Sequence, residues 1–493
     1  MAEVVATVVA DTLAELRALR DRETDADLVE LRLDGVRDVD VAGALAGRRR
    51  PVIVTCRPRW EGGRFDGSEE ERLGLLAEAA ERGAEFVDVE WQANRRALER
   101  CRAHTRVIVS NHDFEGVPPD LAARVRAMEG LDPAVVKVAV TASSIGDCLT
   151  LRRAVEGVDS HVAIAMGPAG RVTRLWPAWM GSRWTYGGHA APGQVSTREL
   201  IERFRVRETT AGTTAYAVTG APLGHSASPA MHNAAFAALG LDAVYVPLET
   251  TQADEFFEMA EALPLAGASV TIPLKRILMT SDVSVDGLSK EIGALNTLRR
   301  GSGGWEGRNF DVPGFLAPLE RRGVVLRGRR AVVMGAGGAA RAAVQGLRTA
   351  GADTAIAARR PDAARELASA LGARAADWPP EPGWDLLVNT TPVGMWPRAE
   401  ASPLEDAAFR RAAGAIVYDL VYNPAETKLL AQARAAGAQA IGGLEMLVGQ
   451  AALQFEWWTG RAAPVDLMRE AAREFVDGLQ PAAGQLPLTG SER

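Results

Sequence analysis

One lysine stands inside an apolar, β-branched stretch, where a charged side chain is costly. Lys137 lies in the run Val135-Val136-Lys137-Val138-Ala139-Val140. Burial of an ammonium group usually lowers its pKa, and a neutral amine in a dry pocket can form a Schiff base with a carbonyl group. The structural alternatives are a lysine that reaches solvent from a strand end and one that pairs with a buried acid. The chain contains only four lysines among its 56 basic residues, so Lys is used sparingly where Arg is the default.

Other titratable side chains fall in the later parts of neighbouring β-rich runs. They are Glu30, Arg32, Arg57, Asp88, Glu90 and His112. Residues two apart along a strand share a face, and enzymes built on parallel barrels carry their chemistry at the carboxyl ends of the strands. A row of inward charges would be expensive as structure alone. We therefore expect a polar active site around Lys137, without a metal, because no His, Cys or carboxylate cluster has ligand spacing.

A second region with chemical potential begins at residue 330. The β-rich run Arg330–Met334 leads into Gly335-Ala336-Gly337-Gly338-Ala339 and the start of a helix. Glycines in such a turn let the backbone approach a pyrophosphate, and a helix N-terminus favours the anion. The next β-rich run ends in Arg359-Arg360, where an NAD site would carry an acid, so we predict NADP. A tight βα turn and an exposed pair of arginines are the structural alternatives.

Polar side chains that suit a hydroxylated substrate occur on both sides of this turn. They are Ser226, Ser228, Thr271, Lys275, Asn296, Asp311, Asn389, Thr390, Tyr422 and Gln450. Reduction of a ketone to an alcohol needs a proton donor at the developing alkoxide and hydrogen bonds that orient the substrate. These side chains meet both needs. The structural alternative for Lys275 is that it is a surface lysine that follows a strand.

The elements that would position the first set alternate between strand and helix. Eight β-rich runs are expected, at residues 4–10, 28–33, 51–57, 86–91, 106–112, 135–140, 161–166 and 183–186. Helical stretches such as 69–82 and 119–129 lie between them. This rhythm predicts an α/β protein that begins with a (β/α)8 TIM barrel, with an open, doubly wound sheet as the alternative.

Apolar periodicity stops at residues 208–214, which we interpret as a linker after a barrel of residues 1–207. A second α/β unit follows it. We expect a substrate-binding domain at 215–315 plus 446–480, a Rossmann NADP-binding domain at 316–445 and a polar tail at 481–493.

The composition is that of an ordinary soluble globular protein. The chain is 47% hydrophobic and 24% charged, and its net charge of −7 argues against nucleic acid as a partner. The three cysteines form no CxxC pair, which indicates free thiols in the cytoplasm. The N-terminus lacks the basic region of a signal peptide, and no apolar run of about 18 residues could span a membrane. Monomer and homodimer both stay open.

The first half resembles type I 3-dehydroquinate dehydratases. The matching stretches follow the family order and are Glu30-Leu31-Arg32, Arg57 with Glu61-Gly62-Gly63, Asp88-Val89-Glu90, Ser110-Asn111-His112-Asp113-Phe114, Lys137-Val138-Ala139, Met166-Gly167, Thr173-Arg174 and Ala191-Pro192-Gly193-Gln194. The resemblance implies that Lys137 forms an imine with the C3 ketone of 3-dehydroquinate, that His112 transfers the protons and that Glu61 orients His112.

The same resemblance implies a set of substrate ligands. Arg174 is implied to bind the substrate carboxylate, and Gln194 to close a lid. The implied ligands of the substrate hydroxyls are Glu30, Arg32 and Arg57. Ala190 departs from the pattern, because many members of the family carry Ser there.

The second half resembles shikimate dehydrogenases over about residues 214–480. The matching stretches are residues 226–229, 270–275, 293–297, 309–311 and 389–395, Tyr422 and residues 443–450. The resemblance implies that Lys275 and Asp311 form the acid–base pair. The implied substrate ligands are Ser226, Ser228, Thr271, Asn296, Tyr422 and Gln450, and the implied NADP contacts are Gly335, Ala336, Gly337, Gly338, Ala339, Arg359, Arg360, Asn389, Thr390 and Gly443.

Two departures accompany this second resemblance. Phe310 stands where the family usually has Thr, followed by Val312 and Pro313, so we expect a reshaped pocket floor. Ala363 stands where a further Arg is common, which weakens the charge near the predicted NADP phosphate.

The two resemblances together predict consecutive reactions: 3-dehydroquinate to 3-dehydroshikimate in the barrel, then reduction to shikimate with NADPH. One alternative combines another Schiff-base lyase with a quinate dehydrogenase. The other is a non-catalytic sensor of pathway metabolites, against which the presence of Lys137, His112, Lys275 and Asp311 argues.

Overall fold

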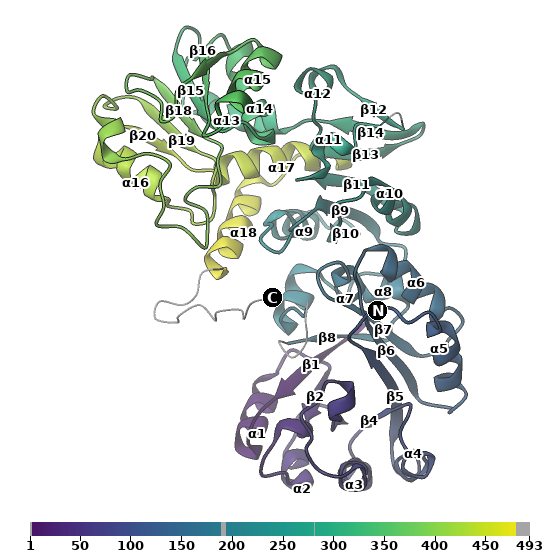
Figure 1. Cartoon of the computed structure of the whole chain (residues 1–493). Coiled ribbons are helices and arrows are strands. Elements are labelled where there is room, and N and C mark those ends of the chain that lie inside the picture. The colour runs from purple at the N-terminus through teal and green to yellow at the C-terminus, as the bar shows by residue number, and fades with distance from the viewer. Residues whose placement is uncertain (1, 189–193, 281, 480–493) are drawn as a thin grey trace. The chain divides into compact units, whose positions relative to one another are not determined.

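The computed structural model describes residues 2–188, 194–280 and 282–479 (Figure 1). The chain divides into two compact units, Met1–Thr219 with Asp242–Leu265, and Gly220–Leu241 with Ala266–Arg493. Ala190 and the Ala-Pro-Gly part of the lid motif lie outside the described residues, as does the predicted polar tail.

The first unit contains an eight-stranded parallel sheet that follows the chain around a nearly closed barrel. Its strands are β1 (Glu3–Val9), β2 (Leu28–Arg32), β3 (Val52–Thr55), β4 (Phe86–Glu90), β5 (Arg106–Asp113), β6 (Val135–Thr141), β7 (His161–Met166) and β8 (Trp184–Gly187). The order β7-β6-β5-β4-β3-β2-β1-β8 joins the last strand to the first. At the remaining seam the backbone N–H of Arg183 donates to the carbonyl of His161 at 2.8 Å. The predicted barrel is confirmed, and the open sheet is wrong.

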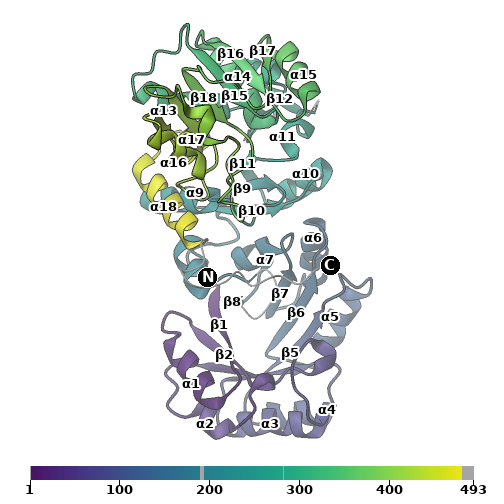
Figure 2. The same ribbon diagram turned by 60° about the vertical axis from the view of Figure 1, so that its left-hand side comes forward.

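Helices cover the outside of these strands (Figures 1 and 2). They are α1 (Leu13–Arg22), α2 (Val41–Leu45), α3 (Glu69–Glu81), α4 (Arg95–Arg102), α5 (Leu121–Glu129), α6 (Gly146–Ala154), α7 (Arg171–Leu175) and α8 (Pro177–Met180). The start of α3 is set by a capping box, in which Ser68 and Glu71 bond to each other's backbone N–H groups. The shortness of α2, α7 and α8 lets eight βα units fit into little more than 200 residues.

The inside of the barrel is built in three levels, because inward side chains recur every second residue. The lowest level takes one apolar side chain from each strand: Val5, Leu28, Ile53, Phe86, Ile108, Val135, Val162 and Trp184. Two residues further along come the middle level, Thr7, Glu30, Thr55, Asp88, Ser110, Lys137, Ile164 and Tyr186, and then the upper level, Val9, Arg32, Arg57, Glu90, His112, Ala139, Met166 and Gly188. The inward side chains therefore change from apolar to largely polar over two residues along the strands.

The segment predicted as a linker is held by several hydrogen bonds. Trp176 Nε1 donates to the carbonyl of Thr210 at 3.0 Å, and the backbone N–H of Thr210 donates to Thr213 Oγ1 at 2.9 Å. Thr213 Oγ1 in turn donates to Asp242 Oδ1 at 2.7 Å. Threonine hydroxyls thus supply hydrogen-bond partners to this segment, which forms neither a helix nor a strand.

After this segment comes a six-stranded mixed sheet in the order β10-β9-β11-β13-β14-β12. Its elements are β9 (Thr214–Gly220), α9 (Ser228–Ala238), β10 (Ala243–Glu249), α10 (Ala253–Ala262), β11 (Leu265–Val270), α11 (Leu274–Ile277), β12 (Val283–Val285), α12 (Gly287–Ile292), β13 (Thr297–Gly301), β14 (Gly304–Arg308) and α13 (Asp311–Arg321). Strand β13 pairs antiparallel with β11 and β14, and β12 pairs parallel with β14.

The third sheet is wholly parallel, in the order β17-β16-β15-β18-β19-β20, which is the Rossmann arrangement. Its elements are β15 (Arg330–Met334), α14 (Gly338–Thr349), β16 (Asp353–Ala357), α15 (Pro361–Leu371), β17 (Arg374–Ala376), β18 (Leu386–Asn389), β19 (Ile416–Asp419), α16 (Lys428–Ala435) and β20 (Gln439–Ile441), followed by α17 (Leu444–Thr459) and α18 (Val465–Gly478). Helices α13, α14 and α15 pack on one face and α16 on the other. The strand order reverses between β15 and β18, where such sheets bind their ligands.

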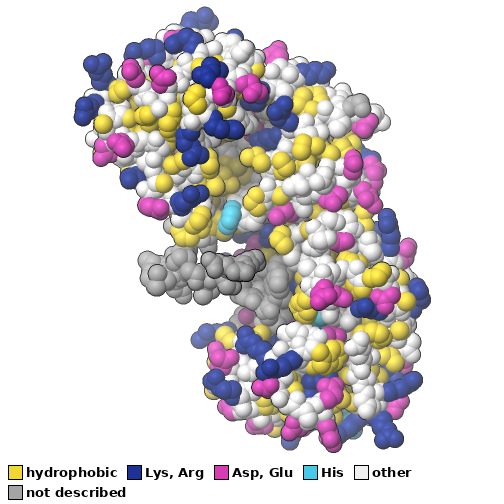
Figure 3. Space-filling model, in the orientation of Figure 1, with side chains coloured by type: hydrophobic (Ala, Val, Ile, Leu, Met, Phe, Trp, Pro, Cys, Tyr) yellow, Lys and Arg dark blue, Asp and Glu magenta, His cyan; other side chains and the backbone are white. Residues whose placement is uncertain are grey.

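Basic, acidic and apolar side chains are interspersed on the face shown in Figure 3. In the part of the chain that the structure describes, no helix has both the length and the apolar character needed to cross a bilayer.

Gly170 tests the packing at the end of β7. A Cβ atom there would collide with the backbone carbonyl of Ala165. We expect Gly170→Ala to destabilise the barrel by about 2 kcal/mol, because backbone atoms cannot move aside. Gly74→Ala, in α3, is the matched control: its Cβ would face open space, and Ala favours a helix over Gly by about 0.5–1 kcal/mol. Urea unfolding followed by tryptophan fluorescence compares them, and equal midpoints would contradict this packing.

Candidate active sites

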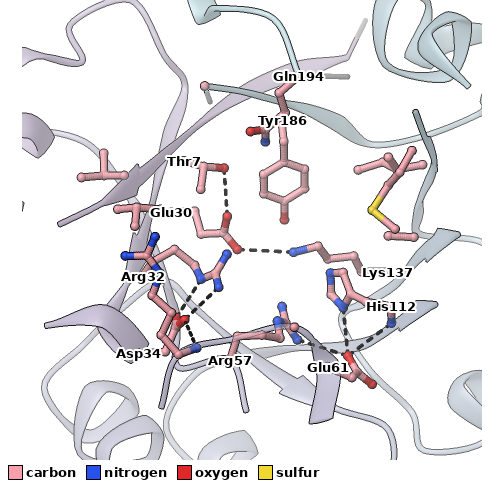
Figure 4. Close-up of a pocket in the computed structure, with 18 of the residues that line it drawn as sticks. Thr7, Glu30, Arg32, Asp34, Arg57, Glu61, His112, Lys137, Tyr186 and Gln194 are labelled. Carbon is pink, nitrogen blue, oxygen red and sulfur yellow. Dashed lines mark hydrogen bonds and ion pairs between the residues drawn. The ribbon is translucent and has the colours of Figure 1, made fainter. Parts of the chain in front are cut away.

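A cavity of about 640 Å³ opens at the carboxyl ends of the barrel strands. Its polar lining comes mainly from the middle and upper levels and consists of Thr7, Glu23, Glu30, Arg32, Asp34, Arg57, Glu61, Arg64, His112, Lys137, Arg174, Tyr186 and Gln194. Figure 4 shows most of these side chains directed into one space. The structure therefore brings together the catalytic and substrate-binding residues implied for the first site: Glu30, Arg32, Arg57, Glu61, His112, Lys137, Arg174 and Gln194.

Lys137 lies on the floor of this cavity between two carboxylates. Its Nζ donates to Asp88 Oδ2 at 2.9 Å and to Glu30 Oε1 at 3.3 Å. Burial lowers the pKa of Lys137, but the two carboxylates outweigh burial, so the pKa is raised above its ordinary value. The raised pKa contradicts the prediction of a lysine made neutral by burial. The contacts agree with the structural alternative, in which the lysine pairs with buried acids.

A buried ion network surrounds the carboxylate that holds the lysine. Arg57 donates to Asp88 at 2.9 Å, to Glu90 at 2.6 Å and to Ser110 at 2.8 Å. Arg72 donates to the other oxygen of Glu90 at 2.6 Å. Asp88 and Glu90 have no exposed surface, and neither lines the cavity. These two acids therefore balance the cations of the site.

His112 and Glu61 form a pair at the side of the cavity. Glu61 Oε2 lies 2.9 Å from His112 Nδ1 and accepts the backbone N–H of His112 at 3.2 Å. Burial raises the pKa of Glu61 to about 7, although Arg57 opposes this. Burial and the charges of Arg57 and Lys137 hold the pKa of His112 well below its ordinary value. An ionised Glu61 would keep the hydrogen on Nδ1 and leave Nε2 as a base.

Arg174, on α7, offers a cation to the same cavity. Its side chain is buried, burial lowers its pKa to about 10, and its Nε has no hydrogen-bond partner among the described residues. A buried guanidinium with an unused donor suits a carboxylate ligand. Gln194, half-buried, also lines the cavity.

Glu30 and Arg32 are fixed by neighbours that the sequence analysis missed. Glu30 accepts from Thr7 and from Thr55, each at 2.9 Å. Arg32 holds Asp34 through two bonds of 2.8 and 2.9 Å. Thr7 and Thr55 each lie two residues beyond an inward apolar position of their strands, so the period of two could have found them.

Tyr186 is another cavity residue that was missed. It lies on β8, the weakest of the predicted strands, and the Nζ of Lys137 stands 4.4 Å from the centre of its ring. Tyr186 lies two residues after the inward Trp184, so the period of two could have identified it as an inward side chain.

The second site centres on a lysine–aspartate pair. Lys275 Nζ donates to Asp311 Oδ2 at 2.6 Å, and Asn296 Nδ2 donates to Asp311 Oδ1 at 2.8 Å. Lys275 stands in α11, and Asp311 begins α13. The Asp311 backbone N–H is held by Asn309 Oδ1 at 2.9 Å. The fold thus joins both predicted acid–base residues directly.

The side chain of Asn296 is saturated with hydrogen bonds. Besides Asp311, its Nδ2 donates to Gln450 Oε1 at 3.2 Å. Its Oδ1 accepts from Thr297 Oγ1 and from the backbone N–H of Phe310, both at 2.8 Å. With two donors and two acceptors used, Asn296 positions Asp311 and Gln450.

The remaining predicted substrate ligands lie around the ends of β9 and β11. Ser226 Oγ accepts the backbone N–H of Ser228 at 3.4 Å, where α9 begins. The hydroxyl of Tyr422 donates to the carbonyl of His225 at 3.4 Å, which brings Tyr422 next to the serines. Thr271 follows β11, four residues before Lys275.

The ring of Phe310 packs against Trp457 and takes no part in the hydrogen-bond network around Asn296. The ring packs edge to face on Trp457 with centroids 5.6 Å apart, and Arg299 and Arg308 also lie over Trp457. Only the backbone N–H of Phe310 joins the Asn296 network.

The glycine-rich turn lies at the carboxyl end of β15, beside the switch in strand order. Gly335 has a φ of 115°, and a Cβ there would collide with Thr390 Oγ1. Thr390 donates its N–H and its hydroxyl to the carbonyl of Met334, at 2.9 and 2.7 Å. A Cβ at Gly338, where α14 begins, would lie 3.8 Å from Lys275 Cδ, so the turn borders the acid–base pair. Ala336, Gly337 and Ala339 complete this turn.

The other predicted cofactor residues surround the same strand ends. Arg359 and Arg360 are exposed just after β16. Asn389, at the end of β18, is buried and donates to Asp419 at 2.8 Å while accepting the Thr391 N–H at 3.0 Å. A Cβ at Gly443 would collide with the carbonyl of Leu420. Asn389 and Gly443 thus fix the backbone at this edge.

Family models match three parts of the chain. The model for type I 3-dehydroquinase matches residues 2–211. The shikimate dehydrogenase substrate binding domain matches residues 218–298, and the shikimate 5'-dehydrogenase C-terminal domain matches residues 443–473.

Relatives and solved structures agree with these matches. The bifunctional 3-dehydroquinate dehydratase/shikimate dehydrogenase of Arabidopsis thaliana is 33% identical over 94% of this chain and 83% of the relative. The shikimate dehydrogenase (NADP(+)) of Moorella thermoacetica is 44% identical over 56% of this chain and 98% of the relative. The structure of shikimate 5-dehydrogenase from Thermus thermophilus with NADP(H) and shikimate is 38% identical, with a TM-score of 0.50, over 53% of this chain and 99% of that one. The chain therefore belongs to the family of bifunctional 3-dehydroquinate dehydratase/shikimate dehydrogenases.

Proposed function

We propose that the protein catalyses two consecutive reactions of the shikimate pathway: the barrel dehydrates 3-dehydroquinate to 3-dehydroshikimate, and the second half reduces this product to shikimate with NADPH. The observation that carries the proposal is a lysine amine on a cavity floor beside a His–Glu pair that can move protons. Neither a quinate-preferring enzyme nor a metabolite sensor is favoured, because the relatives are named as shikimate dehydrogenases.

The raised pKa of Lys137 is compatible with imine formation. A protonated lysine and a ketone give a protonated imine and water, so charge is conserved. The C–N bond forms, the C–O bond breaks, and two of the three ammonium protons leave with the oxygen. Lys137 can start from the state that Asp88 and Glu30 stabilise if neighbouring groups shuttle protons.

His112 would carry out the elimination. As a neutral base held by Glu61, it takes a proton from the carbon next to the imine carbon, and the electron pair moves toward the imine nitrogen. The same proton then goes to the departing hydroxyl, which leaves as water. Hydrolysis of the imine releases 3-dehydroshikimate and restores Lys137. Arg174 would hold the substrate carboxylate throughout.

In the second half, NADPH supplies the hydride for reduction of the carbonyl carbon. Lys275 would protonate the carbonyl oxygen as charge develops there, and Asp311 holds the ammonium group at 2.6 Å. Ser226, Ser228, Thr271, Tyr422 and Gln450 would bind the substrate's carboxylate and hydroxyls.

The residues around β15 and β16 fit a dinucleotide with a 2′-phosphate. The turn from Gly335 to Ala339 presents backbone and the start of α14 to a pyrophosphate. Arg359 and Arg360 place two exposed cations after the second strand, where an acid would favour NAD.

We also propose a cytoplasmic enzyme that acts as a monomer or homodimer. All three cysteines are free and buried, which suits a reducing compartment.

A coupled assay tests the function. With 3-dehydroquinate and NADPH, the wild-type protein is expected to consume NADPH. Lys137→Ala should leave 3-dehydroquinate unchanged, because no imine can form, and Lys275→Ala should accumulate 3-dehydroshikimate. Nicotinamide absorbance and chromatography of the products measure both steps. NADPH consumption by Lys137→Ala at the wild-type rate would remove Lys137 from the mechanism.

The dehydratase should lose kcat/KM at acid pH, by up to roughly tenfold per pH unit below about 7. Glu61 has a pKa of about 7, so it is a carboxylate above that pH and a neutral acid below it. The neutral acid can donate to Nδ1 and shift the hydrogen of His112 to Nε2, which removes the base. Glu61→Gln cannot titrate and should abolish this acid limb while lowering activity. If Glu61→Gln still loses activity at acid pH as the wild type does, a group other than Glu61 causes that loss. The dehydrogenase activity of the same samples is the control.

The two exposed arginines should set the cofactor preference. We expect Arg359→Ala and Arg360→Ala to raise KM for NADPH by about 10–100-fold, as loss of a charge-assisted hydrogen bond would, and to leave KM for NADH unchanged. Arg365→Ala is the matched control, because this exposed arginine pairs with Asp362 on α15. Equal effects on both cofactors would contradict a role at the 2′-phosphate.

A further inference from the structure

Tyr186 places a hydroxyl inside the dehydratase cavity that the proposed mechanism does not use. Its side chain is 2% exposed, and its hydroxyl forms no hydrogen bond of standard geometry with any described residue. Lys137 Nζ stands 4.4 Å from its ring centre. Figure 4 shows the hydroxyl directed toward the space between Lys137 and Glu30. Burial without a partner is costly for a hydroxyl, so this position calls for a ligand.

The surroundings leave the hydroxyl hydrogen available to that ligand. Burial raises the pKa of Tyr186, while Lys137 and the indole N–H of Trp184 act to lower it. An indole N–H can only donate, so Trp184 can approach the hydroxyl oxygen alone. Lys137 is itself a donor. Neither of these two neighbours accepts the hydroxyl hydrogen, which leaves it available to a substrate oxygen.

The other groups near Lys137 are poorly suited to protonate a ketone oxygen there. Asp88 is ionised, because Arg57 and Lys137 outweigh burial and hold its pKa below the ordinary value. Glu30 accepts from Thr7, Thr55 and Lys137. His112 is directed by Glu61 and is needed at the neighbouring carbon. A proton donor beside the lysine nitrogen is missing from this set.

We propose that Tyr186 is a catalytic residue that relays protons between Lys137 and the ketone oxygen during formation and hydrolysis of the imine. As the ammonium of Lys137 gives one proton to the phenol oxygen, the phenol gives its own proton to the ketone oxygen. The freed lone pair of the nitrogen then bonds to the carbonyl carbon in place of the C–O π bond. A second relay of the same kind lets the oxygen leave as water. The phenol is unchanged after each relay, and two protons pass from nitrogen to oxygen. The inference rests on the proposed dehydratase function.

The test compares Tyr186→Phe with wild type in the full-length protein. The ring and its contact with Lys137 remain, and only the relay is lost. Protein is mixed with 3-dehydroquinate, quenched with borohydride at increasing times, and the reduced adduct on Lys137 is quantified by mass spectrometry. We expect adduct formation about 100-fold slower, at the lower end of the usual effect of a general acid. The isotope effect of deuterium at the abstracted position should shrink, because imine formation becomes limiting.

Two further proteins separate a relay from a structural role. Tyr418→Phe removes another buried, unpartnered hydroxyl, on β19, and should form the adduct at the wild-type rate. Replacement of Tyr186 by 3-fluorotyrosine keeps an acidic hydroxyl and should retain the rate within a few fold, even if Tyr186→Phe folds poorly. Wild-type adduct rates in Tyr186→Phe would overturn the inference but leave the Schiff base intact. Absence of any adduct in wild type would overturn both.

Discussion

Asp88 is the carboxylate on which the barrel interior depends. One of its oxygens receives both Lys137, at 2.9 Å, and Arg57, at 2.9 Å, and the other receives Ser110 at 2.5 Å. Two buried cations this close would repel each other strongly in a medium of low polarity without the shared anion. Removal of one partner from such a network typically costs about 3–5 kcal/mol. The catalytic lysine is therefore also part of the fold.

The need to pair buried charges explains why the three levels of the barrel differ in composition. The lowest level is apolar and closes the barrel. Above it, Lys137 and Arg57 each stand near two or more carboxylates. Two buried groups without a hydrogen-bond partner among the described residues, Arg174 Nε and the hydroxyl of Tyr186, belong to residues that line the cavity. Saturated groups hold the site, and unsaturated ones await substrate. The second half follows the same rule, since Asn296 is saturated and fixes Asp311.

The sequence predicted the eight barrel strands to within about two residues, because alternation of inward and outward side chains is a local property. It also identified Lys137 and His112, whose chemistry is unusual for their positions, and the resemblance to a known family added Glu61. It could not predict the protonation of Lys137, because Glu30 lies 107 residues away along the chain and Asp88 lies 49 residues away. Tyr186 escaped notice because β8 is a short strand in a run that lacks β-branched residues except Thr185. In the second half, the saturation of Asn296 by Gln450 depends on a contact across 154 residues.

The most direct measurement is the pH titration of the Lys137 amine in the free enzyme by nitrogen-15 NMR of labelled lysine. The chain has only four lysines, so comparison with Lys137→Ala identifies the signal. We expect Lys137 to stay an ammonium beyond the ordinary lysine pKa of about 10.4, because Asp88 and Glu30 hold it. Titration near neutral pH would contradict this role of the two carboxylates. The lysine would then be made neutral by burial, and the carboxylates would not control it.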